Sequence, residues 1–264
     1  MDPGTEAGMT QIIILRMTPN KPYRQTPMNN TFQIFKQPDK DAAAAEAGEY
    51  LNSYLIDNKK RALLLMLSGG SAFNILDYVG QAALGENLTV SVLDERFSED
   101  PSINNFSQLQ KSDFYQLALE AGASFFGTLP RPNESMFELA ARWEKNLHNW
   151  KTENPEGLIL ASLGMGPDGH TAGIFPFPED AGKFHQLFEN DNWVTAYDAA
   201  GKNPFPQRVT TTATFFKQID FGFAYVCGQE KSAMLKRALE GNDEFSALPA
   251  CAWQNIKEVM IFRD

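Results

Sequence analysis

The stretch "ALLLMLSGGSAFNIL", residues 62–76, decides the fold. Its apolar run at 62–67 is short and unbroken, which is typical of a strand that is buried on both faces of a parallel sheet. A glycine-rich turn follows, and the pattern then predicts a helix from Ala72. A strand that leads through such a turn into a helix is the first half of a βαβ unit.

The same alternation of apolar runs and helical patterns continues along the chain. Helices are expected where apolar residues recur every three or four positions, and strands where short apolar runs stand between turn residues. The expected helices cover 39–60, 107–122, 135–151 and 231–241, and the expected strands cover 88–95, 157–164, 193–199, 208–216, 221–228 and 258–264. We therefore predict an α/β fold with three layers (α/β/α), Rossmann-like, in which helices cover both faces of a mostly parallel sheet.

The same pattern bounds the domain organisation. No linker long enough to separate two domains interrupts the alternation, so residues 28–264 are expected to form a single α/β domain. The first 27 residues are rich in Pro, Thr and Asn and lack the apolar segment of a signal peptide. We treat residues 1–27 as an N-terminal extension that is either disordered or not native.

Composition narrows the range of partners. Of the 264 residues, 33 are acidic and 23 are basic, and this net charge of −10 argues against nucleic-acid binding through a basic face. No apolar run reaches the roughly 18 residues of a spanning helix, so no membrane partner is expected. Two cysteines without C-x-x-C spacing indicate reduced thiols and a cytoplasmic location. The three histidines and two cysteines form no cluster in the sequence, so no metal site is expected. We also expect a monomer or small homo-oligomer, with a small molecule as its ligand.

Three segments of interest directly follow expected strands. Ligands of open parallel sheets bind beyond the carboxyl ends of the strands, so segments at these ends converge on one edge. The first segment is Ser68-Gly69-Gly70-Ser71. Its glycines let an anion approach the backbone, and the helix that follows offers free amides, with Ser71 as a candidate cap. An ordinary glycine-rich turn explains the segment equally well.

The second segment, "DER", closes the next expected strand. Arg96 is suited to bind a carboxylate or phosphate with two hydrogen bonds, and Asp94 is suited to orient a hydroxyl or exchange a proton. Two more cations stand in comparable places: Arg208 begins a threonine-rich strand, and Lys231 lies in the first turn of a helix, where it opposes the helix dipole. Taken singly, each of these charges is explained better by simple solvation.

The third segment, "LGMGPDGHTAGIFP" at 163–176, allows several interpretations. Its G-x-G-x-x-G spacing imitates a dinucleotide loop, but Asp168 would repel the pyrophosphate and no acid ends the next strand at the required distance. Thr171 imitates a nucleophile elbow, but only one histidine follows it. An acid–base site requires the fewest additional features, because Asp168, two residues before His170, is placed to fix the tautomer of its imidazole. The alternative without function is a surface histidine.

Five motifs in this order resemble the 6-phosphogluconolactonase family, within the wider group that includes glucosamine-6-phosphate deaminase. The motifs are LSGGS, LDER, LGMGPDGHTAGIFP, PQRVTTT and GQEKSAMLKRAL, and the resemblance covers residues 31–264. It implies a fold of the sugar-phosphate isomerase/deaminase type. It also implies hydrolysis of 6-phospho-D-glucono-1,5-lactone in the oxidative pentose phosphate route, without a cofactor.

The resemblance also implies roles for individual residues. His170 matches the general base that activates a water molecule, and Asp168 would position His170 or the substrate. Asp94 matches an acid at a strand end, and Arg96 matches an arginine specific to the lactonases. The residues that match the phosphate-binding part of the site are Ser68, Gly69, Gly70, Ser71, Arg208 and Lys231.

Two alternatives stay open. One is a sugar-phosphate isomerase or deaminase of the same fold. The deaminase relatives carry motifs similar to D-E-Y and D-G-H-I-A-F-N-E-P where this chain has "DER" and "DGHTAGIFP". The acid that helps to open the sugar ring in those relatives is therefore absent here, which favours the lactonase. The other alternative is a non-catalytic sugar-phosphate-binding protein, which only the divergent loop 97–106 suggests. Within it, "NNF" at 104–106 approximates the usual S-N-Y, while Gly173 and Thr211 stand for a usual Ser and Leu.

Overall fold

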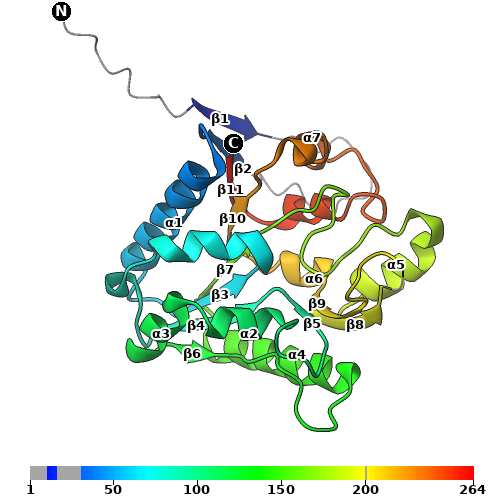
Figure 1. Ribbon diagram of the computed structural model, residues 1–264, viewed down its shortest axis with the longest axis horizontal. Helices are drawn as coiled ribbons and strands as arrows, with labels where there is room; N and C mark the ends of the chain where they lie inside the picture. The colour runs from blue at the N-terminus through cyan, green and yellow to red at the C-terminus, as the bar shows by residue number, and fades with distance from the viewer. Residues whose placement is uncertain (1–10, 17–30, 200) are drawn as a thin grey trace, which may run out of the picture.

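An eight-stranded sheet dominates the computed structural model, which describes residues 11–16, 31–199 and 201–264 (Figure 1). The strand order is β1-β2-β11-β10-β7-β3-β4-β6. The strands from β2 to β6 in this order run parallel, and β1 pairs antiparallel with β2 at one edge. The bounds are β1 (Gln11–Arg16), β2 (Thr31–Lys36), β3 (Leu63–Leu67), β4 (Leu88–Val92), β6 (Ser124–Phe125), β7 (Leu158–Leu163), β10 (Phe221–Tyr225) and β11 (Glu258–Arg263).

Helices lie on both sides of this sheet, with α1 on one side and α6 on the other (Figure 1). The α-helices are α1 (Lys40–Asp57), α2 (Asn105–Gln110), α3 (Asp113–Glu120), α4 (Met136–Glu153), α5 (Ala181–Phe188), α6 (Ala213–Phe216) and α7 (Ser232–Glu240). The 3-10 helices are η1 (Gly70–Tyr78), η2 (Gln81–Ala83), η3 (Pro178–Asp180), η4 (Gln229–Lys231) and η5 (Pro249–Asn255). Every residue of β3 and β4 is buried, as a strand covered on both faces requires. The predicted α/β fold with a mostly parallel sheet is confirmed.

A second, antiparallel sheet was not expected. It has the order β5-β9-β8, from β5 (Asp94–Arg96), β8 (Val194–Asp198) and β9 (Gln207–Thr211). Leu93 joins the two sheets: its amide donates to the Leu67 carbonyl (2.8 Å) in the main sheet, and its carbonyl accepts from the Thr211 amide (3.0 Å) in β9. The expectation of one continuous strand over 88–95 is therefore wrong.

Other boundaries also differ from the expected ones. The helix expected over 107–122 is two helices, because the Ser112 hydroxyl accepts from the Tyr115 amide (3.2 Å) and starts α3 after α2 has ended. The helix expected from Ala72 is the 3-10 helix η1. Its N-cap residue is Gly69, which has no side chain to cap it, so the expected cap by Ser71 is wrong.

The N-terminal part of the chain contributes strands that the sequence patterns did not predict. Phe32 and Phe35 of β2 are buried, and β2 adds to the sheet beside β11. The expectation that residues 1–27 form a disordered or non-native extension falls mostly outside the described residues. Within that stretch the structure describes only β1. In the described part of the chain, no helix has the length and apolar character needed to cross a membrane.

The strand order determines where a ligand can bind. The strands β10, β7, β3 and β4 are consecutive neighbours and parallel, so their carboxyl ends lie along one edge of the sheet. The three segments "SGGS", "DER" and "GMGPDGH" follow β3, β4 and β7 respectively. They therefore meet at this edge, as the sequence predicted.

Candidate active site

A cavity of about 320 Å³ opens at the carboxyl ends of β10, β7, β3 and β4. This volume is within the range of about 300–1,000 Å³ found for small-molecule sites. Its walls come from the loops after β3 and β7, from β5 and β9, and from the end of η4. The predicted site residues that line it are Ser68, Gly69, Gly70, Ser71, Asp94, Arg96, His170, Arg208 and Lys231.

The remaining predicted residue, Asp168, lies against the His170 imidazole. Its Oδ1 is 2.6 Å from Nδ1 of His170 and also accepts from the His170 amide at 3.2 Å. Partial burial alone would raise the pKa of the Asp168 carboxyl, but the hydrogen bonds and charge of His170 outweigh burial and hold that pKa below 3.8. An ionised Asp168 makes Nδ1 the protonated ring nitrogen, so Nε2 of His170 is left as the basic atom.

The glycines of this loop shape its backbone around the imidazole. A Cβ atom on Gly166 would lie 2.2 Å from ring atoms of His170, so only glycine lets the ring fold against the chain there. Gly169 has φ +83°, a conformation that favours glycine. The Thr171 hydroxyl donates to the Gly164 carbonyl (2.9 Å) and accepts from Nε1 of Trp253 (3.0 Å), which anchors the loop in the core. The glycine spacing thus serves packing around His170.

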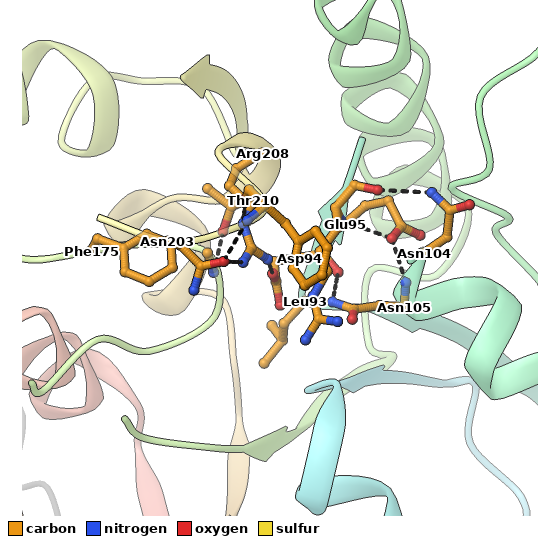
Figure 2. A network of polar contacts seen from close by, with 12 residues as sticks. Leu93, Asp94, Glu95, Asn104, Asn105, Phe175, Asn203, Arg208 and Thr210 are labelled. Atoms are coloured by element: carbon orange, nitrogen blue, oxygen red, sulfur yellow. Dashed lines mark hydrogen bonds and ion pairs between the residues drawn. The ribbon is translucent and has the colours of Figure 1, made fainter. Parts of the chain in front are cut away.

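A buried ion pair forms the opposite wall (Figure 2). Nη1 of Arg208 donates to Oδ2 of Asp94 at 3.0 Å, and their side chains are only 5% and 6% exposed. Arg208 also donates from Nε to the Phe205 carbonyl and from Nη2 to Oδ1 of Asn203, both at 3.0 Å. Its guanidinium carbon lies 5.3 Å from the centre of the Phe175 ring. Arg208 is thus held by several partners before any ligand arrives.

Arg96 and Lys231 supply the other positive charges of the cavity. The Arg96 guanidinium lies 5.3 Å from the centre of the Phe205 ring, and its Nε is buried without a hydrogen-bond partner. Burial lowers the pKa of Arg96 and the nearby Arg208 lowers it further, while Asp94 opposes both. Among the described residues no acid forms an ion pair with Lys231. Because Asp94 neutralises Arg208, the net positive charge of the cavity comes mainly from Arg96 and Lys231.

The loop after β3 fits a ligand that approaches the backbone. The Ser68 hydroxyl accepts from the Gly164 amide (3.1 Å) and so fixes the loop to the end of β7. A Cβ atom on Gly69 would lie 2.5 Å from Oδ1 of Asn105, so glycine is required at this close contact. Gly70 has φ +67° and open space before it. This combination leaves room for an anion close to the main chain.

Two lining residues, Asn105 and Asn203, were not predicted as site residues. Asn105 begins α2 and donates from Nδ2 to the Asp94 carbonyl (2.9 Å), while its Oδ1 is buried without a partner (Figure 2). In the sequence, only the partial match of "NNF" to a family motif pointed to Asn105 as a site residue. Asn203 lies between β8 and β9, where no motif marked the chain. In the described part of the chain, no three His, Cys, Asp or Glu side chains cluster as metal ligands would.

Comparison with known proteins identifies the family. The family model described as glucosamine-6-phosphate isomerases/6-phosphogluconolactonase matches residues 38–261. The chain belongs to this family. The matched range contains every residue of the cavity wall described above.

Individual relatives agree with this assignment. A 6-phosphogluconolactonase of Rattus norvegicus is 38% identical over 95 residues, which are 36% of this chain and only 34% of that protein. One of Xylella fastidiosa is 25% identical over 189 residues, 71% of this chain and 76% of that protein. The crystal structure of a 6-phosphogluconolactonase from Shewanella baltica shares the fold, with a TM-score of 0.70, 20% identity and coverage of 87% of this chain and 96% of that one.

Proposed function

We propose that this protein hydrolyses 6-phospho-D-glucono-1,5-lactone to 6-phospho-D-gluconate, the lactone-opening step of the oxidative pentose phosphate route. The observation that carries the proposal is the position of His170. Its ring is held by Asp168 at 2.6 Å and lines one cavity with the "SGGS" loop and Lys231. A base, a glycine-rich loop and cations around one cavity suit a phosphorylated ester. Relatives that bear the name 6-phosphogluconolactonase support the choice of substrate.

In the proposed mechanism, Nε2 of His170 takes a proton from water while the water oxygen attacks the lactone carbonyl carbon. Asp168 keeps Nδ1 protonated and stabilises the imidazolium that forms. The bond between the carbonyl carbon and the ring oxygen then breaks, and the ring oxygen receives the proton from His170. Arg96 is the cation that we assign to the negative charge on the carbonyl oxygen, and Asp94 orients a substrate hydroxyl.

The phosphate is assigned to the other end of the cavity. Ser68, Gly69, Gly70 and Ser71 offer backbone amides and hydroxyls, and Lys231 offers a charge with no ion-pair partner in the described part of the chain. Arg208 completes this group, but its charge is matched by Asp94. We infer that Arg208 contributes more by holding Asp94 in place than by attracting the phosphate.

The test is lactone hydrolysis measured as proton release, corrected for spontaneous ring opening. Wild-type protein is expected to accelerate the reaction. His170→Ala should lower kcat sharply, and Asp168→Asn should lower it about 100-fold or more, because it removes the partner that fixes the tautomer. A His170→Ala variant that retains the wild-type rate contradicts the mechanism. Ammonia release from glucosamine 6-phosphate would indicate a deaminase, and binding of 6-phosphogluconate without turnover would indicate a sensor.

The setting of the reaction is also proposed. Cys227 and Cys251 form no disulfide in the structure, which fits the reducing conditions of the cytoplasm. The catalytic unit is assigned to residues 28–264, acting as a monomer or small homo-oligomer. Intact mass under non-reducing conditions and sedimentation measure the thiol state and the assembly.

A further inference from the structure

Glu95 is a fully buried carboxylate between two residues of the cavity wall. It is 0% exposed and does not line the cavity, whereas Asp94 and Arg96 on either side of it do. Successive side chains of a strand point to opposite faces, so β5 directs Glu95 away from the cavity and toward α2. Figure 2 shows Glu95 beside Asn105, on the side of Asp94 away from Arg208.

Each oxygen of the Glu95 carboxylate accepts two hydrogen bonds. Oε1 accepts from the amides of Arg96 (2.8 Å) and Asn105 (2.5 Å). Oε2 accepts from the Phe106 amide (3.0 Å) and the Thr128 hydroxyl (2.8 Å). Three of these donors are backbone N–H groups, which cannot become acceptors. The arrangement is therefore complementary to the ionised carboxylate, which only accepts.

These contacts hold two sides of the cavity together. Asn104, at the N-cap position of α2, makes no capping bond with its side chain, and Glu95 instead accepts from the first two amides of the helix. The same oxygen of Glu95 accepts from Arg96 and from Asn105, so the two residues are fixed relative to each other. Asn105 in turn donates to the Asp94 carbonyl.

We propose that Glu95 is a positioning residue for the proposed hydrolysis: its carboxylate form fixes Arg96 and Asn105 in the cavity wall, and protonation of Glu95 loosens them. This proposal rests on the function proposed above. On protonation, one oxygen of Glu95 must donate, and the Thr128 hydroxyl has to turn to accept. Both oxygens of the neutral acid are weaker acceptors than those of the carboxylate, so the hydrogen bonds from the amides of Arg96 and Asn105 to Oε1 weaken along with the bond from Phe106 to Oε2.

The surroundings of Glu95 place this change near neutral pH. Burial raises the pKa of Glu95 to about 7, in spite of the hydrogen bonds from Thr128, Phe106 and Asn105 that lower it, and Asp94 raises it further. The charged groups on the elements around Glu95 are Asp94 and Arg96 of β5 and Arg208 of β9. Beside Thr128, Arg142 of α4 donates to the carbonyls of Gly127 (2.9 Å) and Leu129 (3.0 Å), and Glu134 neutralises it in an ion pair. The helix α2 has no charged residue, and Thr128 is flanked by Gly127 and Leu129.

The test compares Thr128→Val with Thr128→Ser as matched variants. Valine removes one hydrogen bond to Glu95 and keeps the shape, so the acid limb of the pH profile of kcat/KM is expected to move up by about one pH unit. Serine keeps the hydroxyl, and its profile should stay at the wild-type position. Both variants leave the His170 loop unchanged, so a difference between them reports Glu95.

A second variant, Glu95→Gln, tests the carboxylate itself. The glutamine amide nitrogen would face donors, so kcat/KM at pH 8 should fall about 100-fold through displacement of the cavity wall. Adding Thr128→Val to Glu95→Gln should no longer shift the profile. The proposal is overturned if the two Thr128 variants share one acid limb, or if Glu95→Gln stays within about threefold of wild type. If Glu95→Gln does not fold, the Thr128 pair decides.

A separate readout distinguishes this proposal from the proposed function. Binding of 6-phosphogluconate is measured by calorimetry across the same pH range for wild type and both Thr128 variants. A pH shift in binding for Thr128→Val alone supports the role of Glu95 even if wild-type protein does not open the lactone. Lactone turnover together with identical binding and activity profiles supports the hydrolase and overturns the role of Glu95.

Discussion

Replacing Arg208 by methionine should destabilise the whole protein as well as weaken substrate binding. Arg208 and Asp94 are both more than nine-tenths buried, and methionine would leave the Asp94 carboxylate in the interior without its cation. Removing one partner of a buried ion pair costs about 3–5 kcal/mol, much of it because the remaining charge is unpaired. The Phe205 carbonyl and the Asn203 amide oxygen would also each lose a donor. We expect the free energy of unfolding to fall by about 4 kcal/mol.

The measurement is urea denaturation followed by the fluorescence of the four tryptophans. The double variant Asp94→Asn/Arg208→Met removes both charges. It therefore isolates the interaction energy between Asp94 and Arg208 from the other contacts of each side chain. It should be more stable than the sum of the single changes predicts, with a coupling energy of about 2 kcal/mol. The matched control is Lys231→Met, a half-buried cation of the same cavity without an ion pair in the described part of the chain. It should change stability by less than about 0.5 kcal/mol while raising KM.

Two results would refute this account of Arg208. One is a loss of less than about 1 kcal/mol for Arg208→Met, which would mean that the pair is effectively solvated. The other is strict additivity of the single and double variants. Either result would leave Arg208 as a ligand-binding cation only, comparable to Lys231.

The remaining predictions concern a buried acid and a crowded glycine. Because the pKa of Glu95 in the folded state is raised to about 7 from its ordinary value of 4.5, its contribution to stability is full below pH 4.5 and is lost as the pH rises to about 7. Wild type minus Glu95→Gln should therefore lose about 3 kcal/mol of unfolding free energy over this range, and a flat difference would contradict the assignment. Gly173→Ser should cost about 1–3 kcal/mol, because its Cβ would lie 2.9 Å from Cβ of Thr210 and 3.2 Å from Cβ of Asp94. The control is Gly182→Ser at an exposed position of α5, where the nearest atom to the added Cβ is 3.6 Å away. Both variants are compared by thermal unfolding, and equal shifts in Tm would show that Thr210 and Asp94 move aside for the serine at little cost.

The main sheet could be predicted because its strands are buried on both faces. The run "LLLML" has no polar residue, and "LTVSV" has only the small hydroxyl residues Thr89 and Ser91, which are buried; glycines or charges mark the ends of both runs. The second sheet could not be predicted in the same way. Leu93 is as buried and apolar as the residues before it, so nothing in the pattern marks where the chain leaves one sheet for another. That crossing is set by hydrogen bonds to Leu67 and Thr211, which are distant in sequence.

The candidate site shows the same division. Some site residues follow the ends of predicted strands, and their position in the sequence was enough to predict them. These are His170, Asp168 and the "SGGS" loop. The partnership of Arg208 with Asp94 spans 114 positions of sequence and depends on the antiparallel pairing of β5 with β9. The role of Glu95 could not be predicted from the sequence, because a charged residue in "DER" is expected to be exposed to solvent. Only the structure shows that Glu95 is buried with four hydrogen-bond donors.

The crossing at Leu93 also has a consequence for how relatives of this protein can diverge. His170 and the "SGGS" loop follow strands of the main sheet, whereas Asp94 and Arg208 lie in the small sheet and Asn203 lies in the connection between its strands β8 and β9. The strands β8 and β9 are antiparallel neighbours, and hairpin connections between such strands tolerate changes in length and sequence. Evolution can therefore exchange this connection, and with it Asn203 of the cavity wall, without disturbing the parallel core. Grafting the hairpin from a relative is a direct route to altered substrate preference.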